Sequence, residues 1–422
     1  MRVGLQSWGT EGDLRPFLAL GQALQRRGHD VKVVFTSIEG KDFTSLAAST
    51  GVETRFVDDG YFVANREELG RRTRDGLRAN PTKQLELVLK YLMDPVVDSM
   101  LDAARALAAD SDVVVGHFIA HTAAAAAAEH AKPYVMVALQ PVFASAHYPP
   151  SGVPALGRLF NPLLWKLADH VIDASLRGRM NASRARCGLP PKKRFKAIEL
   201  GDPRSVLVAV SPSLFLRPPD WSSLLDICGF FGLSEAAPQE WKPDARVEAF
   251  LAEGAPVYLS FGSMFGMDHR HTMEAVEIFA AALTLAGARG IVQAPASVIA
   301  RAPRQDDVCY IERAPHAQLF PRCSAIVHHG GAGTTQAAIL AAKGSVVVPH
   351  VADQFYWGDL LYARGLGAKP LKRPALAPRP LATRIRAVLD DPSMASRAAE
   401  VAATLSTERG VERAVDIITG LL

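Results

Sequence analysis

Short apolar runs alternate with amphipathic stretches through the first half of the chain. Residues 3–6 and 31–36 are typical of buried strands, and between them apolar residues recur at helical spacing over 16–28. The same criteria predict further strands at 113–116, 134–139 and 206–210 and a helix at 94–109. Because strands that alternate with helices form parallel sheets covered on both faces, this half predicts an α/β domain.

The second half repeats the pattern with different residues. It predicts strands at 256–261, 290–293, 308–311, 325–327 and 346–348, and helices at 272–286, 335–342 and 355–364. The stretch between the halves is rich in Pro, Trp and Gly and lacks periodicity, which is typical of a connection. We therefore expect two doubly wound domains, at 1–216 and 256–400, joined by a linker at 217–255, with a C-terminal helical segment at 401–422 that can pack back on the first domain.

Composition and charge narrow the class of protein. The 422 residues include 47 Lys and Arg against 43 Asp and Glu, and a scattered net charge of +4 argues against nucleic-acid binding. The four cysteines have no CxxC spacing, which disfavours a disulfide framework or a zinc site. The first residues are typical of a strand and not of a signal peptide, and the apolar stretch 122–128 is too short to span a bilayer. We therefore expect a cytoplasmic protein without stable membrane insertion.

The strongest local motif is the segment 325–335, which reads Ala-Ile-Val-His-His-Gly-Gly-Ala-Gly-Thr-Thr. A buried strand leads into two histidines, then three glycines, then two threonines that open a helix. Glycines allow the backbone to approach a ligand closely, and the free amides at a helix start favour an anion. The alternative is a tight strand-to-helix turn with no ligand. No Walker lysine follows, so the motif is not a P-loop, and the glycine spacing is not that of a dinucleotide-binding fingerprint.

A second polar motif follows the strand predicted at 346–348. Asp353 and Gln354 are adjacent there, and a carboxylate beside an amide can both accept and donate hydrogen bonds to sugar hydroxyls. The alternative, that Asp353 caps the helix that begins after it, can hold at the same time.

These motifs together resemble a known signature. The segment from Arg313 to Thr335, followed by Ala352-Asp-Gln354, is similar to the donor-binding region of the GT1 family of nucleotide-sugar glycosyltransferases. The closest branch contains sterol glucosyltransferases, glycopeptide-antibiotic glycosyltransferases and rhamnosyltransferases. That family has the GT-B fold, in which two Rossmann-like domains face a central cleft. The resemblance implies an acceptor-binding first domain and a donor-binding second domain.

The resemblance also implies roles for individual residues. It assigns the donor diphosphate to His329, Gly331, Gly333 and Thr334, and the sugar hydroxyls to Asp353 and Gln354. Ser263 would lie at a second turn facing phosphate or ribose, and His316 would border the nucleobase. Plant members carry a Trp that stacks on uracil where this chain has Arg313, so a UDP-sugar and a dTDP-sugar are both expected donors. No cofactor is implied.

The loop after the first strand holds the candidate base. Residues 7–16 read Ser-Trp-Gly-Thr-Glu-Gly-Asp-Leu-Arg-Pro, and Pro16 suits the first turn of the next helix. Taken alone, Asp13 is more simply explained as a cap of that helix. The loop resembles the Gly-Thr-Arg-Gly-Asp-Val-Gln-Pro segment of the sterol and glycopeptide branch, where the matching Asp is the general base. We therefore expect Asp13 to be catalytic in an inverting transfer of a hexose.

The acceptor is expected in the first domain. His117, Phe143 and Tyr148 are candidates for contact with it, although each is individually more typical of a structural residue. The aromatic residues of this region favour a hydrophobic acceptor such as a sterol, a polyketide or a lipid. No Asp-x-Asp sequence follows a strand of the second half, so we expect no essential metal ion. Two alternative functions are a nucleotide-sugar epimerase and a noncatalytic auxiliary protein of the same fold.

Overall fold

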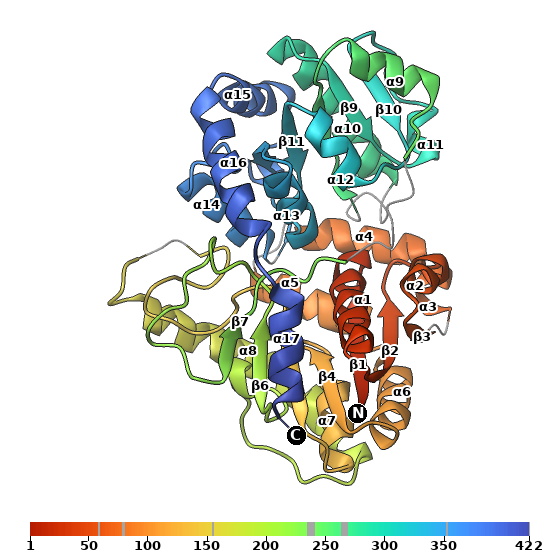
Figure 1. Ribbon diagram of the computed structural model, residues 1–422, viewed down its shortest axis with the longest axis vertical. Coiled ribbons are helices and arrows are strands. Elements are labelled where there is room, and N and C mark those ends of the chain that lie inside the picture. Colours follow the sequence, from red (N-terminus) through yellow and green to blue (C-terminus); the bar gives the residue numbers. More distant parts are fainter. Residues whose placement is uncertain are drawn as a thin grey trace. The chain divides into compact units, whose positions relative to one another are not determined.

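The chain forms two compact α/β units (Figure 1). The computed structural model describes residues 1–57, 60–77, 81–153, 156–233, 241–262, 269–351 and 353–421. The first unit comprises Met1–Arg66, Asn80–Ala236 and Glu408–Leu422, and the second comprises Glu67–Ala79 and Ala237–Thr407. Each unit is built on a parallel sheet of its own, as the alternation of strands and helices predicts.

The sheet of the first unit has seven strands in the order β3-β2-β1-β4-β5-β6-β7, all parallel. Their bounds are β1 (Arg2–Gly9), β2 (Asp30–Ser37), β3 (Glu53–Phe56), β4 (Val113–His117), β5 (Tyr134–Ala138), β6 (Ser205–Val208) and β7 (Leu225–Ile227). The strand order reverses direction between β1 and β4. In doubly wound sheets, ligands bind outside the carboxyl ends of the strands at such a switch point.

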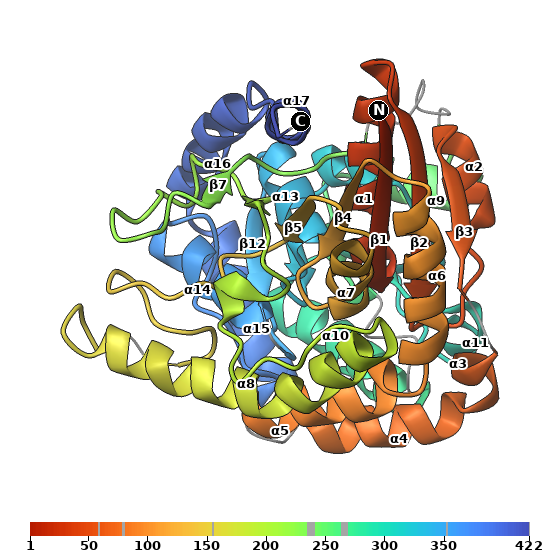
Figure 2. The same cartoon turned by 90° about the horizontal axis from the view of Figure 1, so that it is seen from below.

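Helices cover both faces of this sheet (Figure 2). The helical segments of the unit are α1 (Glu11–Arg26), α2 (Thr44–Thr50), α3 (Tyr61–Ala64), α5 (Pro81–Val88), the π-helix η1 (Leu89–Met93), α6 (Val97–Ala109), α7 (His121–Glu129), α8 (Asn161–Arg186), η2 (Ala197–Glu199) and α17 (Gly410–Thr419). Helices α1 and α17 share a hydrophobic core with one face, in which Phe17 and Leu14 pack with Ala414 and Ile418. Helices α6 and α7 lie on the other face.

The sheet of the second unit has five parallel strands in the order β10-β9-β8-β11-β12. Their bounds are β8 (Val257–Leu259), β9 (Gly290–Gln293), β10 (Val308–Ile311), β11 (Ala325–His328) and β12 (Gly344–Val347). The helical segments are α4 (Arg66–Leu77), α9 (Ala245–Ala252), α10 (His269–Ala286), α11 (Ala296–Ile299), α12 (His316–Leu319), η4 (Phe320–Arg322), α13 (Ala332–Leu340), α14 (Gln354–Ala363), η5 (Arg373–Ala375), α15 (Pro378–Leu389) and α16 (Pro392–Leu405). The switch point of this sheet lies between β8 and β11.

Helix α1 and the segment 217–255 differ from the sequence-based expectation. Helix α1 begins at Glu11 and contains Pro16, whereas the proline rule predicted a start at Pro16. The Thr10 and Asp13 backbone and side-chain contacts form a cap that starts the helix more than a turn earlier. The segment 217–255, expected to be a linker, contains strand β7 and helix α9. The sequence pattern did not indicate them, because a three-residue strand and a short helix are too brief to show a clear periodicity.

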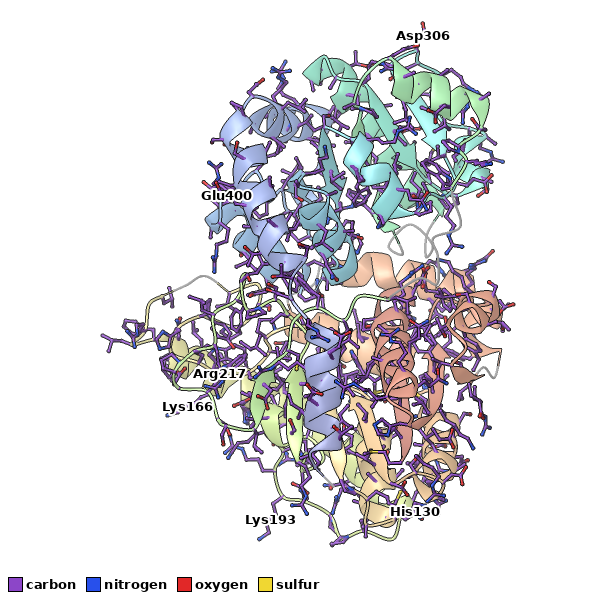
Figure 3. The ribbon with its side chains drawn as sticks, in the orientation of Figure 1. His130, Lys166, Lys193, Arg217, Asp306 and Glu400 are labelled. Carbon is purple, nitrogen blue, oxygen red and sulfur yellow. The ribbon has the colours of Figure 1, made fainter. Side chains whose placement is uncertain are left out.

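Charged side chains lie on the surface of the protein, and its cysteines are buried. Charged side chains such as Lys193, Asp306 and Glu400 are exposed (Figure 3). The four cysteines, Cys187, Cys228, Cys309 and Cys323, are buried free thiols. Among the described residues, no helix combines the length and the apolar character that a membrane span requires.

The backbones of Gly229, which follows strand β7, and Gly410, at the start of α17, lie side by side with no room for a side chain between them. A β-carbon added at Gly410 would lie 2.6 Å from the carbonyl carbon of Gly229 and from the oxygen of Phe230. The returning segment is also fixed by Glu408, whose Oε1 accepts hydrogen bonds from the hydroxyls of Ser211 and Ser213 at 2.6 Å each. A side chain at Gly410 would therefore push backbone against backbone.

We expect Gly410→Ala to lower the unfolding midpoint of the first unit, because overpacking against backbone costs about 1–3 kcal/mol. Gly178→Ala is the matched control. Gly178 lies within α8 with no atom within 4 Å of an added β-carbon, so alanine there should stabilise by about 0.5–1 kcal/mol. Thermal unfolding of both variants checks this, and equal midpoints for the two would contradict this backbone contact.

Candidate active site

The candidate base lies at the switch point of the first unit. Strand β1 ends at Gly9, and Asp13 occupies the first turn of α1, which follows directly. Strand β4, the neighbour of β1 across the switch, ends at His117. The register that pairs Gln6 with Gly116 brings the carboxyl ends of these two strands together.

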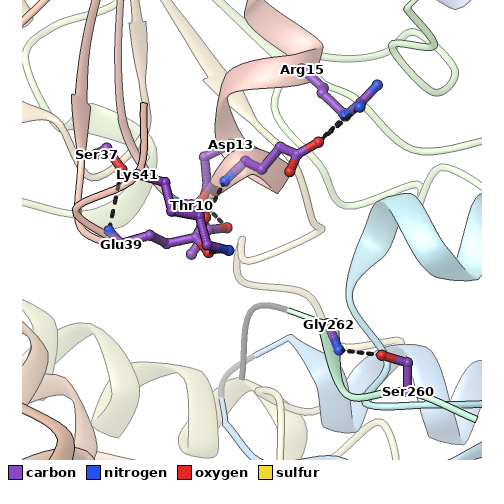
Figure 4. A network of polar contacts seen from close by, with 9 residues as sticks. Thr10, Asp13, Arg15, Ser37, Glu39, Lys41, Ser260 and Gly262 are labelled. Atoms are coloured by element: carbon purple, nitrogen blue, oxygen red, sulfur yellow. Dashed lines mark hydrogen bonds and ion pairs between the residues drawn. The ribbon is translucent and has the colours of Figure 1, made fainter. Parts of the chain in front are cut away.

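The Asp13 carboxylate is held in one orientation by Thr10 (Figure 4). Its Oδ2 accepts hydrogen bonds from the Thr10 amide at 2.8 Å and from the Thr10 hydroxyl at 3.1 Å. Gly9 makes this possible, because its φ of 138° belongs to the region that favours glycine and a β-carbon there would lie 2.3 Å from Oδ2. Asp13 therefore does cap α1, as the simpler explanation held, while its second oxygen remains available.

That second oxygen faces His117. The distance from Asp13 Oδ1 to His117 Nε2 is 3.7 Å. The imidazole is buried, with the rings of Phe17 and Phe118 centred 6.2 Å and 4.9 Å from its own. Its other nitrogen, Nδ1, is buried and has no hydrogen-bond partner among the described residues. Sequence reasoning placed His117 in the acceptor site and did not pair it with Asp13, since only the strand register shows that proximity.

Burial shifts both groups in opposite directions. Desolvation raises the pKa of Asp13 to about 6, even though the Thr10 hydrogen bonds act to lower it. Desolvation lowers the pKa of His117 to about 4. Near neutral pH the carboxylate is therefore charged but poorly solvated, while the imidazole is neutral. A carboxylate in this state is a stronger base than one in water.

The glycine segment of the second unit forms the start of α13 after strand β11. The first helical amide with an intrahelical partner is that of Thr335, which donates to Gly331 at 2.9 Å. The amides of residues 332–334 precede it and are those that a helix leaves without internal partners. An added β-carbon at Gly333 would meet no atom within 4 Å, so the space beside this turn is open.

The two histidines of the motif have different surroundings. His328 Nδ1 accepts a hydrogen bond from the Gly330 amide at 3.1 Å, which gives it a structural function in the turn. His329 Nδ1 is buried without a partner among the described residues. A β-carbon at Gly331 would lie 2.5 Å from His329 Nε2, so Gly331 must be glycine for the imidazole to lie against the helix start.

Burial also sets the charge of these histidines. Desolvation lowers the pKa of His328 to about 3 and that of His329 to about 4, and neighbouring His316 adds to both shifts. His329 is therefore neutral near pH 7 and can act on a ligand as a hydrogen-bond donor without carrying a charge. His316 therefore lies close enough to His329 to affect its pKa, while the contacts of both residues with a donor stay a prediction.

Gln354 is placed beside the glycine turn but is partly committed to the fold. A β-carbon at Gly330 would lie 2.9 Å from the Gln354 carbonyl oxygen, so the starts of α13 and α14 are close. The side-chain Oε1 of Gln354 accepts hydrogen bonds from the amides of His350 and Val351, at 2.8 Å and 3.2 Å. Only its amide nitrogen remains to donate to a ligand. Asp353 lies at the N-cap of α14 and makes no side-chain capping bond there.

Other features of this site could not be read from the sequence. The imidazole of His316 stacks on Phe320 with ring centres 4.3 Å apart. The Arg373 guanidinium lies 5.9 Å from the ring centre of Phe261, and its charge contributes to lowering the pKa of His350. Because Arg373 is distant from the motif in sequence, no local pattern indicated it. Ser263 lies outside the described residues.

The predicted acceptor residues Phe143 and Tyr148 belong to an aromatic cluster of the first unit. The Phe143 ring is 6.0 Å from Trp221, and the Tyr148 ring is 5.7 Å from Trp165 and 5.3 Å from Phe215. The Tyr148 hydroxyl donates to the Phe143 carbonyl at 2.5 Å. Phe143 is fully buried in this cluster, and contact of either residue with an acceptor stays a prediction.

Within the described ranges, no group of three or more His, Cys, Asp or Glu is arranged to hold a metal ion. The acidic pair after α11 includes Asp306, whose side chain points into solvent (Figure 3).

The raised pKa of Asp13 predicts a pH-dependent stability. Because the folded protein binds this proton more tightly than the unfolded chain does, the stability that Asp13 contributes is complete below pH 4 and is lost as the pH rises through about 6. Relative to Asp13→Asn, the wild-type protein should therefore lose about 1–3 kcal/mol of unfolding free energy between pH 4 and pH 7. Chemical unfolding at both pH values measures this, and a constant difference would show that Asp13 is not desolvated.

Comparison with known proteins supports the resemblance seen in the motifs. Residues 292–418 match the family model for the C-terminal domain of erythromycin biosynthesis protein CIII-like proteins. The O-mycaminosyltylonolide 6-deoxyallosyltransferase of Streptomyces fradiae is 31% identical over 99% of this chain and 97% of its own length. A sterol 3-beta-glucosyltransferase of Arabidopsis thaliana is 29% identical over 99% of this chain and 67% of its own.

Solved structures show the same fold. The glycosyltransferase VinC, in complex with dTDP, superimposes with a TM-score of 0.68 at 20% identity, over 99% of this chain and 98% of the other. Two parallel-sheet units, each with its candidate residues at the switch point, are the architecture expected from the sequence. The chain therefore belongs to the GT1 family of glycosyltransferases, with the GT-B fold, and is an enzyme that transfers a sugar.

Proposed function

We propose that this glycosyltransferase moves a hexose from a UDP- or dTDP-sugar to a hydroxyl of a hydrophobic small molecule, with inversion at the anomeric carbon. The observation that carries the proposal is the Asp13 carboxylate, oriented by Thr10 and with its pKa raised to about 6 at the switch point of the first sheet. A base with this pKa is largely ionised near neutral pH and still able to take a proton.

Activation of the acceptor falls to the free oxygen of Asp13. Its Oδ2 is already occupied by two donors from Thr10, so the acceptor hydroxyl donates to Oδ1. The hydroxyl oxygen forms a bond to the anomeric carbon as its proton passes to Asp13, and the bond from that carbon to the diphosphate oxygen breaks. A single displacement of this kind inverts the configuration of the sugar.

The leaving diphosphate is stabilised at the start of α13. The amides of residues 332–334 and the helix dipole favour an anion at this point. His329 adds a neutral donor, since burial lowers its pKa to about 4 and leaves its ring uncharged before the ligand binds. Donors that are already in place stabilise the charge that develops on the diphosphate without having to reorganise, and such preorganised electrostatic stabilisation is a large contribution to catalysis.

Recognition of the sugar is assigned to the start of α14. The amide nitrogen of Gln354 can donate to one hydroxyl because its oxygen is held by the backbone at 350–351. Asp353 at the preceding position supplies an acceptor. Because the Gln354 amide nitrogen can only donate and the Asp353 carboxylate can only accept hydrogen bonds, the site prefers hexoses whose hydroxyls match both.

The relatives support the choice of substrates. The similar protein from Streptomyces fradiae is named for transfer of a deoxyallose to a tylonolide, and the one from Arabidopsis thaliana for glucosylation of a sterol. VinC, which has the same fold, is described with bound dTDP. A dTDP- or UDP-hexose and an apolar alcohol are therefore the substrates to test first.

We expect Asp13→Asn to reduce turnover by about 10²–10⁴-fold, the usual effect of removing a general base, while nucleotide binding is retained. The matched control is Glu11→Gln, which removes a carboxylate from the same helical turn where it pairs with Arg15. Product formation with a panel of apolar alcohols, together with calorimetry of UDP and dTDP, measures both quantities. Full turnover by Asp13→Asn would exclude Asp13 as the base.

We expect His329→Ala to weaken binding of the nucleoside diphosphate by about 10–100-fold, the range for a lost hydrogen bond to a charged group. His329→Gln keeps an N–H donor and should recover part of that loss. Calorimetry with UDP or dTDP distinguishes the variants. If neither variant changes the affinity, the diphosphate binds elsewhere.

A further inference from the structure

The proposed reaction leaves one buried titratable group of the first site unused. His117 lies with Nε2 3.7 Å from Asp13 Oδ1, at the end of the neighbouring strand, and is almost fully buried. Nothing in the assignment of Asp13 as base requires a histidine there. One nitrogen of this buried imidazole lies close to the carboxylate of the proposed base, and the other has no hydrogen-bond partner among the described residues, an arrangement that requires an explanation.

We propose that His117 is a positioning residue for Asp13, which rests on the function proposed above: as a neutral imidazole protonated at Nε2, it points its N–H at Oδ1 and fixes the oxygen that receives the acceptor proton. Thr10 holds Oδ2 by two hydrogen bonds, and the His117 Nε2 atom lies 3.7 Å from Oδ1, so each oxygen of the carboxylate has a polar neighbour of its own.

The surroundings select the tautomer. If Nδ1 carried the proton, a buried N–H donor would have no partner, and the Nε2 lone pair would face the charged oxygen of Asp13. Both features are unfavourable. With the proton on Nε2, the donor faces the anion and only an acceptor lone pair is left unsatisfied, which is the smaller cost.

The same surroundings prevent His117 from taking up the proton that Asp13 receives from the acceptor. The rings of Phe17 and Phe118 pack against the imidazole, and desolvation lowers its pKa to about 4. The acceptor proton therefore stays on Asp13 after transfer, and Asp13 releases it once the diphosphate departs. His117 acts on the carboxylate without changing its own protonation.

The other charged side chains near Asp13 and His117 are engaged in contacts of their own. Glu11 is paired with Arg15, and Glu39 with Lys41, on the segments that flank the Asp13 turn. Of the next residues on the His117 side, His121 is near Asp94 and Arg179 and contacts the Ser183 hydroxyl at 3.4 Å. The described charged groups beside the pair thus have partners of their own.

The test compares two amides at position 117. The side chain of Gln places an N–H where Nε2 lies, whereas that of Asn reaches only the position of Nδ1. Loss of a donor to the charged carboxylate should raise the pKa of Asp13, so the acid limb of kcat/KM in His117→Asn should move about 0.5–1 pH unit upward, with kcat reduced about 3–30-fold. His117→Gln should restore the limb to within about 0.2 unit of the wild-type position.

The outcomes distinguish the function of His117 from that of Asp13. A fall in kcat for His117→Asn with an unmoved acid limb, or a Gln variant no better than Asn, would overturn the positioning function while Asp13→Asn still reports on the base. Full turnover by Asp13→Asn would overturn the base itself. His121→Asn, a change at a buried histidine away from Asp13, should leave the limb in place.

A measurement on the unaltered enzyme does not depend on the folding of any variant. Nitrogen NMR of the histidine rings should show His117 as the neutral Nε2–H tautomer at pH 7. A proton on Nδ1, or a charged ring, would contradict the proposal.

Discussion

The proposed chemistry of this enzyme depends on a carboxylate that is largely shielded from water and yet kept charged. Asp13 is held by two hydrogen bonds from a single residue, Thr10, and these oppose a larger desolvation. Stronger hydrogen bonds would lower the pKa of Asp13 and make it a weaker base, whereas weaker ones would leave more of the carboxyl protonated near neutral pH. Gly9 sets this balance, because any side chain there would displace the carboxylate from Thr10.

The same geometric rule operates in both units. Each sheet reverses its strand order once, between β1 and β4 in the first and between β8 and β11 in the second, and each candidate site lies at the carboxyl ends of those strands. The parallel register of β1 and β4 brings together side chains, such as those of Asp13 and His117, that are remote in sequence. In the proposed function, the first unit uses this rule to place a base, and the second uses a helix start and a neutral histidine to receive an anion.

Much of this could be predicted from the sequence, and the remainder has physical reasons. Apolar periodicity located most strands to within a few residues, and the motifs around Asp13 and His329 indicated the family. The proximity of His117 to Asp13 could not be predicted, because it depends on strand register. The commitment of Gln354 Oε1 to the backbone also depends on a loop conformation that no local pattern encodes. The early start of α1 follows from a cap in which Thr10 is the N-cap and Asp13 the third helical residue, whereas the position of Pro16 suggested a later start.

The proposed function requires the Asp13 carboxyl to be shielded from water and to titrate within reach of neutral pH. Carbon NMR of aspartate carboxyls, with Asp13→Asn used to assign the signal, measures this in the intact enzyme. A carboxyl that is desolvated in this way should titrate with a midpoint at about 6. A midpoint near 4, the ordinary value for an aspartate in water, would contradict it.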